Sequence, residues 1–230
     1  CHSDSNSIAV AYAVGGTGPY SYLWYSSTGG SPSSIISSTD TAFGLTSGIY
    51  FAEVTDANGC DTVSSVQVYS PNTSLFSTTQ ISEVVCKGDF SGYIIGDAGG
   101  GFAPYTYTWS TSLSGVIQIT SGVSNTDTLH DISSGIYLLD IEDYYGCKVS
   151  QMSLIVNEPN QPLVLDTIYL IASIACFGDN DGRALGHISG GDPSYVYLWD
   201  NGEPTLSAIH LTSGYHTLSV TDERGCEVLD

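Results

Sequence analysis

Six cysteines are the residues of this chain with the most definite chemistry: Cys1, Cys60, Cys86, Cys147, Cys176 and Cys226. No two of them form a Cys-x-x-Cys pair, and none lies in a close Cys/His cluster, so their spacing argues against a zinc site. Disulfide formation is the chemistry that remains, and six cysteines allow many pairings that sequence alone cannot separate. Reduced, buried thiols are the alternative.

Aspartates near these cysteines could bind a metal ion. We call Cys1, Cys86 and Cys176 the opening cysteines and Cys60, Cys147 and Cys226 the closing cysteines, because each pair brackets one sequence repeat. Three aspartates follow an opening cysteine by three residues: Asp4, Asp89 and Asp179. Three others precede a closing cysteine by four residues, and one more lies in the stretch 178–182: Asp56, Asp143, Asp222 and Asp181. The stretch 178–182, Gly-Asp-Asn-Asp-Gly, looks like part of a calcium loop but lacks the downstream bidentate Glu of an EF-hand. We favour the simpler interpretation that these carboxylates accept backbone N–H bonds in turns, and calcium is the one cofactor considered.

Catalysis finds little support in the sequence. The five histidines, His2, His130, His187, His210 and His216, occupy no common position in the repeats described below. There is no Gly-x-Ser-x-Gly, His-Glu-x-x-His or phosphate-loop motif. Carboxylates are plentiful, but no acid/base pair of a glycosidase can be chosen among them. We therefore expect no catalytic residues.

Composition narrows the class of protein. The 230 residues carry 4 Lys plus Arg against 24 Asp plus Glu, a net charge of -20, which argues against binding nucleic acid or an anionic membrane. Hydrophobic residues make up 41%, enough for a packed core, and 26 Gly and 16 Tyr with 1 Met favour strands and turns over helices. The longest apolar stretch, 163–176, is too short and too interrupted to span a membrane. We expect an all-β extracellular protein.

Internal repetition sets the domain organisation. Three blocks recur in the same order along the chain. The first is Gly-Gly followed by Tyr-x-Tyr-x-Trp, which ends at Trp24, Trp109 and Trp199. The second is a block that contains Ser-Gly, at 45–50, 132–137 and 211–216, and the third is Asp-x-x-Gly-Cys. Pro71 and Pro159 mark the joins, which gives repeat 1 (1–71), repeat 2 (72–159) and repeat 3 (160–230). Repeat 1 is expected to lack its leading strand and repeat 3 its last strand, as if both chain ends fell inside a repeat.

Each repeat is expected to fold as an immunoglobulin-like β-sandwich. The aromatic residues of Tyr-x-Tyr-x-Trp alternate with period two, so they share one face of a strand, and we assign that face to the core. Leu-x-x-Gly-x-Tyr, at 45–50 and in part at 132–137, resembles the corner of such sandwiches where a Tyr hydroxyl bonds back to the chain. In repeat 3 the corner carries Tyr215-His216 and is expected to differ. Asp-x-x-Gly-Cys predicts a hairpin.

Modularity favours one set of disulfides among the alternatives. Two cysteines fall in each repeat, so we expect the bonds Cys1–Cys60, Cys86–Cys147 and Cys176–Cys226. A loop of about 60 residues closed in this way contributes roughly 4 kcal/mol in the chain-entropy model. Such a bond would supply a large part of the stability of a small repeat.

The four blocks in order resemble one known repeat. Cys-x-Gly-Asp-x-x-Gly, Gly-Gly-x-x-Pro-Tyr-x-Tyr-x-Trp, Leu-x-x-Gly-x-Tyr and Asp-x-x-Gly-Cys together are similar to the SprB-type repeat of large surface proteins of Bacteroidota, including a gliding-motility adhesin. The resemblance covers nearly the whole chain. It implies an exported, outer-membrane-attached or secreted cell-surface fibre or stalk, often delivered by type IX secretion, without catalytic residues.

Four Asp-Thr-apolar triplets resemble the O-glycosylation signal of exported Bacteroidota proteins. Their threonines are Thr41, Thr62, Thr128 and Thr167. Sugars at these positions would shield exposed β-surface from proteolysis and edge pairing.

Our leading hypothesis for function is a stalk and multivalent adhesive surface made of sandwiches in an extended array. Its partners would be neighbouring repeats of the same chain and surface glycans or a substratum, bound by many weak contacts. A second hypothesis is a set of carbohydrate-binding modules of a secreted enzyme, which predicts exposed aromatic residues such as Tyr25, Tyr144 and Tyr145. A third is a subunit of an extracellular filament joined by donated strands.

Overall fold

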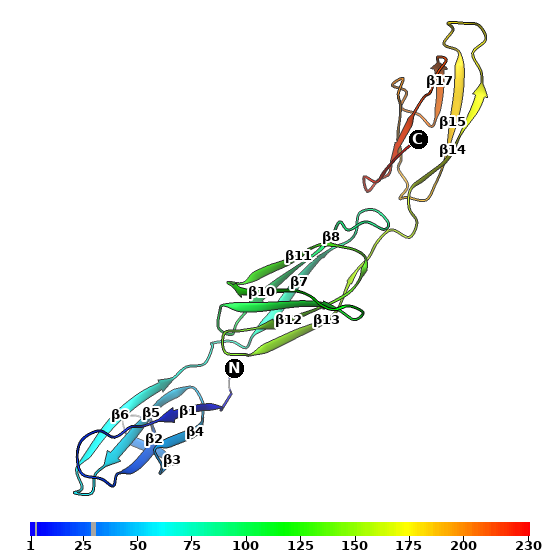
Figure 1. The fold of residues 1–230 in the computed structure, drawn as a ribbon. Helices are drawn as coiled ribbons and strands as arrows, with labels where there is room; N and C mark the ends of the chain where they lie inside the picture. The colour runs from blue at the N-terminus through cyan, green and yellow to red at the C-terminus, as the bar shows by residue number, and fades with distance from the viewer. Residues whose placement is uncertain (3, 29–30) are drawn as a thin grey trace. The chain divides into compact units, whose positions relative to one another are not determined.

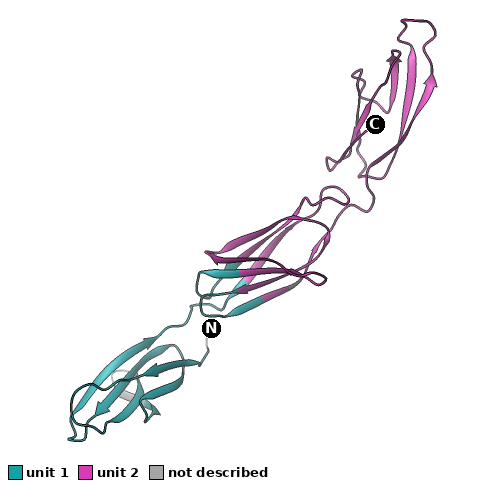
Figure 2. Cartoon of the chain, in the orientation of Figure 1, with its two compact units in different colours: residues 1–76, 98–106, 142–149 teal, residues 77–97, 107–141, 150–230 magenta. Residues whose placement is uncertain are grey.

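A computed structural model describes residues 1–2, 4–28 and 31–230, and in this part of the chain all regular structure is β-strand (Figure 1). The contacts divide the chain into two compact units (Figure 2). The first comprises residues 1–76, 98–106 and 142–149, and the second comprises residues 77–97, 107–141 and 150–230. Repeat 1 thus lies wholly in the first unit and repeat 3 wholly in the second.

Repeat 1 is a sandwich of a two-stranded and a four-stranded sheet. The small sheet pairs β1 (Ser7–Val10) antiparallel with β4 (Thr41–Leu45). The large sheet has the order β3-β2-β5-β6, from β3 (Ser31–Ser37), β2 (Ser21–Thr28), β5 (Gly48–Thr55) and β6 (Asp61–Val68). Buried residues of both sheets, among them Trp24, Ala42 and Leu45, form one core cluster.

Repeat 2 has the complete set of seven strands. One sheet has the order β11-β8-β7, from β11 (Thr126–Ile132), β8 (Gly92–Gly99) and β7 (Phe76–Ser82). The other has the order β10-β9-β12-β13, from β10 (Gly115–Val123), β9 (Tyr105–Thr111), β12 (Gly135–Glu142) and β13 (Lys148–Val156). The first, second and fifth strands of the repeat form one sheet, and the other four strands form the second sheet. This is the Greek-key arrangement of immunoglobulin-like sandwiches.

Repeat 3 repeats this arrangement with fewer strands. One sheet has the order β14-β15-β17, from β14 (Val164–Ala172), β15 (Gly182–Ser189) and β17 (Ser207–Leu211). The other has the order β16-β18-β19, from β16 (Val196–Trp199), β18 (Leu218–Thr221) and β19 (Glu227–Leu229). The core cluster includes Leu163, Trp199 and Leu218. The prediction that repeat 3 lacks its last strand is wrong, because three residues after Cys226 suffice for β19 to pair with β18.

The aromatic rows lie in the cores, as the alternation predicted. Trp24, Trp109 and Trp199 are 3%, 0% and 1% exposed. The first Tyr of each row donates its hydroxyl proton to the carbonyl of the first glycine of the Gly-Gly block, from Tyr20 to Gly15, from Tyr105 to Gly100 at 2.6 Å and from Tyr195 to Gly190 at 2.7 Å. The aromatic rows therefore pack in the core and hold the start of a strand in place, and we do not assign them to a binding surface.

The predicted tyrosine corner is present in repeats 1 and 2, and repeat 3 keeps it with another residue. The hydroxyl of Tyr50 donates to the carbonyl of Thr46 at 3.0 Å, and Tyr137 donates to Ser133 at 2.9 Å. In repeat 3 the ring nitrogen Nε2 of His216 lies 3.0 Å from the carbonyl oxygen of Thr212, four residues back as in the other corners. All three repeats thus have a side-chain hydrogen-bond donor at this position, bonded to the carbonyl four residues back.

The leading strand is the element that repeat 1 lacks among the described residues. β7 and β14 pair with β8 and β15, whereas β1 pairs only with β4. A Cβ added to Gly100 would lie 2.1 Å from the carbonyl oxygen of Ser74, and one added to Gly190 would lie 2.0 Å from that of Pro162. At Gly15, the corresponding glycine, nothing lies within 4 Å of the added atom. The chain that enters the leading strand thus covers this site in repeats 2 and 3 only.

Candidate functional site: cysteine junctions between repeats

Each Asp-x-x-Gly-Cys hairpin is built around the carboxylate of its Asp, which is buried in Asp143 and Asp222 and half-buried in Asp56. In each Asp-x-x-Gly-Cys block, Oδ1 of the Asp accepts the N–H of the residue two positions on and that of the cysteine. The cysteine bond is 2.9 Å at Asp56, Asp143 and Asp222. Oδ2 accepts a third N–H from the Gly-Gly loop, from Thr17, Phe102 or Asp192. These aspartates are therefore turn caps, as the simpler interpretation predicted.

The hydrogen bonds to two of these carboxylates favour their charged form. The N–H of Cys60, followed by that of Thr17, holds the pKa of Asp56 below its ordinary value. Burial of Asp222 acts to raise its pKa, but the N–H bonds from Asp192, Cys226 and Arg224 outweigh it, so the pKa is lowered. A carboxylate committed to three N–H donors has little capacity left for a metal ion.

The opening cysteines lie on short turns of one kind. The N–H of Asp4 donates to the carbonyl of Cys1 at 3.2 Å, Asp89 to Cys86 at 3.1 Å, and Asp179 to Cys176 at 3.1 Å. In repeat 3 the side chains also cap the turn, because Asp179 accepts the N–H of Cys176 and Asp181 that of Ala175. Both kinds of cysteine are thus presented by preformed turns.

The disulfides link different repeats, so the predicted pairing within each repeat is wrong. Cys1 is bonded to Cys147 and Cys86 to Cys226, with Cα–Cα distances of 5.4 and 5.6 Å and sequence separations of 146 and 140. Cys60 and Cys176 are free thiols, and both are exposed. Each opening cysteine that is bonded is therefore joined to the closing cysteine of the next repeat. The first bond lies within the first compact unit and the second within the other.

Strand length explains why a repeat does not bond its own cysteines. Cys147 precedes β13, while the N–H of Val84, two residues before Cys86, donates at 2.9 Å to Asn157, just beyond the far end of that strand. Nine residues of strand span about 30 Å, whereas a disulfide needs Cα atoms within roughly 7 Å. In repeat 1, likewise, Cys60 precedes β6 and His2 contacts the carbonyl of Pro71 beyond its end.

The bonded cysteines are packed into contacts between repeats. Cys86 packs against the core cluster of repeat 3, and Sγ of Cys226 lies 3.5 Å from the carbonyl oxygen of Val85. Arg224, beside Cys226, forms an ion pair with Glu83 at 3.7 Å. At the other junction, Cys1 and Cys147 border a cavity of about 630 Å³ together with Phe102, Tyr145 and residues of repeat 1.

The structure does not bring the candidate calcium ligands together. The proximity of opening and closing carboxylates depended on disulfides within a repeat, and these disulfides do not form. Across residues 1–2, 4–28 and 31–230, no group of three or more His, Cys, Asp or Glu side chains is placed to hold a metal ion.

The rings of Tyr144 and Tyr145 do not lie in one plane. Tyr144 and Tyr145 are each 67% exposed, but their rings meet edge to face at 87°. Phe102 meets Tyr145 at 77°. Tyr25 is stacked on Phe51 with ring centres 5.5 Å apart. The carbohydrate-binding hypothesis stays a prediction.

The four candidate glycosylation threonines all lie in strands. Thr62 is exposed on β6, whereas Thr41, Thr128 and Thr167 are half-buried on β4, β11 and β14. Glycosylation at these residues stays a prediction.

Comparison with known proteins identifies the repeat. Residues 78–114 and 171–204 match the SprB repeat family. The chain carries SprB-type repeats at these two places. Both matched ranges run from the leading-strand region through an opening cysteine to the Trp of the repeat, Trp109 in the first range and Trp199 in the second. The chain is a repeat segment of a cell-surface protein. Disulfides fit an extracellular location.

Other comparisons add similarities of structure alone. No curated protein sequence matches the chain. Three N-terminal domains of the outer capsid protein Hoc of bacteriophage RB49 are 15% identical, with a TM-score of 0.41, covering 100% of this chain and 82% of that one. The amphioxus IgVJ-C2 molecule is 15% identical (TM-score 0.33, 68% and 98% covered), and the eight N-terminal immunoglobulin domains of Down Syndrome Cell Adhesion Molecule are 12% identical (0.35, 99% and 38%). No helix of the described residues is long and apolar enough to cross a membrane.

Proposed function

We propose that this chain is a force-transmitting stalk and multivalent adhesive segment of an exported surface protein. The observation that carries the proposal is the pair of disulfides that join successive repeats. A covalent bond between repeats resists their separation under shear in a way that a bond inside one repeat does not. Such a bond supports a role in transmitting force along the chain.

The residues with catalytic potential have structural roles, which supports a non-catalytic function. The three closing aspartates cap hairpins, and His216 closes a corner. His187 pairs with Asp166 at 3.0 Å on the surface. Function then rests on length, on stiffness at the joins and on a surface presented several times.

Adhesion would arise from many weak contacts to a substratum or to surface glycans. The net charge of -20 favours neutral or cationic surfaces over anionic lipid. Delivery by type IX secretion, glycosylation of the Asp-Thr sites and a part in gliding motility belong to this proposal through the SprB resemblance.

Beads that carry the oxidised chain at graded density, placed under flow over glass and over polysaccharide, would test the adhesive role. We expect the detachment force to rise more steeply than the surface density, because linked weak contacts add by effective concentration. Beads carrying the reduced and alkylated chain are the matched control for the disulfides. Retention equal to that of uncoated beads at every density would contradict the proposal, and tight binding of one glycan by the soluble chain would favour the carbohydrate-binding alternative.

A further inference from the structure

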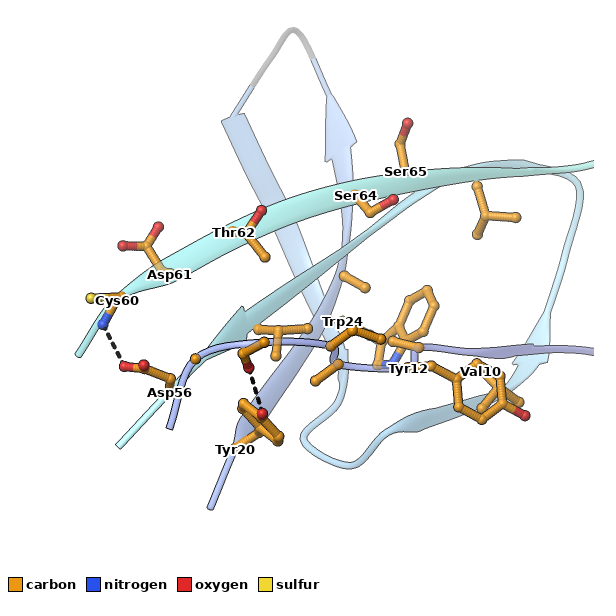
Figure 3. A pocket seen from close by; sticks show the side chains of 18 residues that line it. Val10, Tyr12, Tyr20, Trp24, Asp56, Cys60, Asp61, Thr62, Ser64 and Ser65 are labelled. Carbon is orange, nitrogen blue, oxygen red and sulfur yellow. Dashed lines mark hydrogen bonds between the residues drawn. The ribbon is translucent and has the colours of Figure 1, made fainter. Parts of the chain in front are cut away.

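The outer face of the four-stranded sheet of repeat 1 is apolar. Cross-strand pairing places Tyr25 of β2 between Ile35 of β3 and Phe51 of β5, and Ile35 is 73% exposed. Phe51 pairs in turn with Ser65 of β6. Figure 3 shows the side chain of Ser65 pointing away from Trp24, which belongs to the core, so this row lies on the side of the sheet that faces solvent.

One acidic side chain lies within this apolar surface. The neighbouring row has Glu53 of β5 between Leu23 of β2 and Val63 of β6, and Val63 is 49% exposed. Residues 1–71 include no Lys or Arg, and Glu53 takes part in none of the ion pairs of the described residues. We call this surface the Glu53 face, and it comprises Leu23, Tyr25, Ile35, Phe51, Val63 and Glu53.

The Glu53 face stays open in a complete sandwich and is particular to repeat 1. The leading strands β7 and β14 join the other sheet of their repeats, so a leading strand in repeat 1 would not cover the Glu53 face. The residue after the core Trp is Tyr25 here but Ser110 and Asp200 in repeats 2 and 3. The residue after the corner side chain is Phe51 here but Thr217 in repeat 3. The apolar surface is therefore not a general feature of the repeat.

The outer face of the sheet β14-β15-β17 in repeat 3 is also apolar, and it contains a cation. Ala184 of β15 belongs to the core, so its neighbours Arg183 and Leu185 point outward. Leu185 pairs with Tyr169 of β14, which is 52% exposed. Ile209 of β17 follows a completely buried residue, so it too points outward. We call this surface the Arg183 face, and it comprises Tyr169, Leu185, Ile209 and Arg183.

Arg183 differs from the other three cations of the chain in its electrostatic surroundings. Each of the others forms an ion pair with a carboxylate: Lys87 with Glu158, Lys148 with Glu142 and Arg224 with Asp192. Arg183 is exposed and forms no ion pair within residues 1–2, 4–28 and 31–230, although the chain has 24 Asp plus Glu. Arginine among apolar side chains is typical of the centre of a protein interface, where a carboxylate of the partner pairs with it.

We propose that the Glu53 face of one copy of this chain binds the Arg183 face of a second copy, with Glu53 and Arg183 opposite each other. Each face presents one charge surrounded by apolar side chains, and the two charges have opposite signs. Two Glu53 faces or two Arg183 faces would instead bring like charges together. Because the joined faces differ, the contact repeats from copy to copy and joins many chains. It goes beyond the adhesive role proposed above, because the partner is the chain itself.

The net charge of -20 does not prevent this contact at physiological ionic strength. The Debye length is about 8 Å there, so charges elsewhere on the two copies are largely screened, whereas two groups in contact are screened much less. Association is therefore expected at about 0.15 M salt, and it should weaken at very low ionic strength, where the repulsion between the copies reaches farther.

Sedimentation velocity of the full oxidised chain at graded concentrations tests the proposal, with Cys60 and Cys176 alkylated so that thiols cannot crosslink copies. The wild type is expected to associate reversibly. Glu53→Lys and Arg183→Glu each put like charges in contact, so each should raise the dissociation constant at least about tenfold. The chain that carries both substitutions has the net charge of the wild type and again has opposite charges at the contact, so it should recover most of the affinity.

A matched pair of substitutions separates the contact from general electrostatics. Glu142→Lys and Lys148→Glu make the same charge changes at an exposed ion pair outside both faces, and each should change the dissociation constant less than about twofold. Phe51→Thr gives repeat 1 the residue that repeat 3 has at this place, so it should weaken association without unfolding the repeat. The unfolding midpoint of each variant checks that the fold is kept.

The outcomes distinguish a second copy from other partners of the Glu53 face. A wild type that stays monomeric at every concentration, a double charge exchange that does not recover affinity, or equal losses in the control pair would overturn the proposal. Loss of retention on polysaccharide-coated glass by Phe51→Thr, with a wild type that stays monomeric, would assign the Glu53 face to a glycan instead.

Discussion

At the scale of single residues, the repeat is held together by a few hydrogen bonds that recur at the same positions. Asp222 accepts three backbone N–H groups in a buried site, and the same pattern occurs at Asp143 and Asp56. Because a buried N–H that loses its acceptor is costly, these carboxylates are the residues at which substitution should have the largest local effect.

Asp222→Ala is expected to destabilise repeat 3 by about 2 kcal/mol, the range for hydrogen bonds to a charged acceptor. The pKa of Asp222 is lowered in the folded state, so its contribution is present above the unfolded pKa and is lost as pH falls through the folded pKa. Urea unfolding followed by Trp199 fluorescence, with Trp24 and Trp109 replaced by Phe, measures the effect. Glu223→Gln, an exposed neighbour, is the control; equal losses from both changes would contradict the prediction.

His216 makes the corner of repeat 3 sensitive to pH. Its backbone contact with Thr212 raises the pKa of the ring, burial lowers it, and Asp200 at 3.0 Å raises it again, so that the net change is upward. A raised folded pKa gives stability that is complete below the unfolded value of 6.5 and is lost as pH rises through the folded pKa. Repeat 3 should thus be more stable in mildly acidic than in alkaline solution.

His216→Tyr should remove this dependence, because Tyr fills the corner in repeats 1 and 2 and is neutral in this pH range. The measurement is the difference in unfolding midpoint of repeat 3 between the variant and the wild type across that range. His187→Gln, which removes an exposed pair with Asp166, is the matched control. A difference that does not change with pH would show that His216 does not titrate as argued.

At the scale of elements, the strands and the core could be predicted from the sequence, and the disulfides could not. Period-two alternation placed Trp109 in the core, and the repeated blocks fixed the corners and hairpins, because these features depend on neighbouring residues. Whether Cys86 reaches Cys147 depends instead on which end of the sandwich each occupies. That is a property of the strand order, and the nine residues of β13 between the two ends decide it.

In the described residues β1 pairs only with β4, so its other edge is open to a leading strand like β7 or β14. A copy of residues 161–175, placed directly before Cys1, would reproduce the spacing by which β14 precedes Cys176. We expect it to pair with β1 and to cover Gly15, as Pro162 covers Gly190. Burial of one strand should raise the stability of repeat 1 by at least about 1 kcal/mol, or roughly 4–8 °C in its melting temperature.

Calorimetry of the extended and parent chains measures this gain. The control is the same extension with Pro at the position of Ile168, which pairs with Gly186 in repeat 3, because Pro removes a ladder hydrogen bond from the middle of the strand. If both extensions raise the melting temperature equally, the gain does not come from strand pairing. If neither does, the edge of β1 is not an acceptor.

At the scale of the whole molecule, the two disulfides overlap along the chain and shorten its covalent path. A pull between the two ends passes from Cys1 to Cys147, back along repeat 2 to Cys86, and across to Cys226. About 65 residues then bear the load, so the oxidised chain should extend to roughly 230 Å, against roughly 800 Å when reduced. Most of the chain is thereby protected from stretching, which the proposed role as a stalk under shear would require.

Single-molecule pulling on the chain held at its two ends measures this length, and one variant separates the bonding patterns. With Cys86→Ser and Cys226→Ser together, the bond from Cys1 to Cys147 still bypasses repeat 1 and most of repeat 2, so the chain should extend to roughly 290 Å. If Cys1 were bonded to Cys60 instead, the same variant would extend to roughly 600 Å. The shorter value would support bonds between repeats, because a bond inside repeat 1 cannot shield the strands of repeat 2 from the applied force.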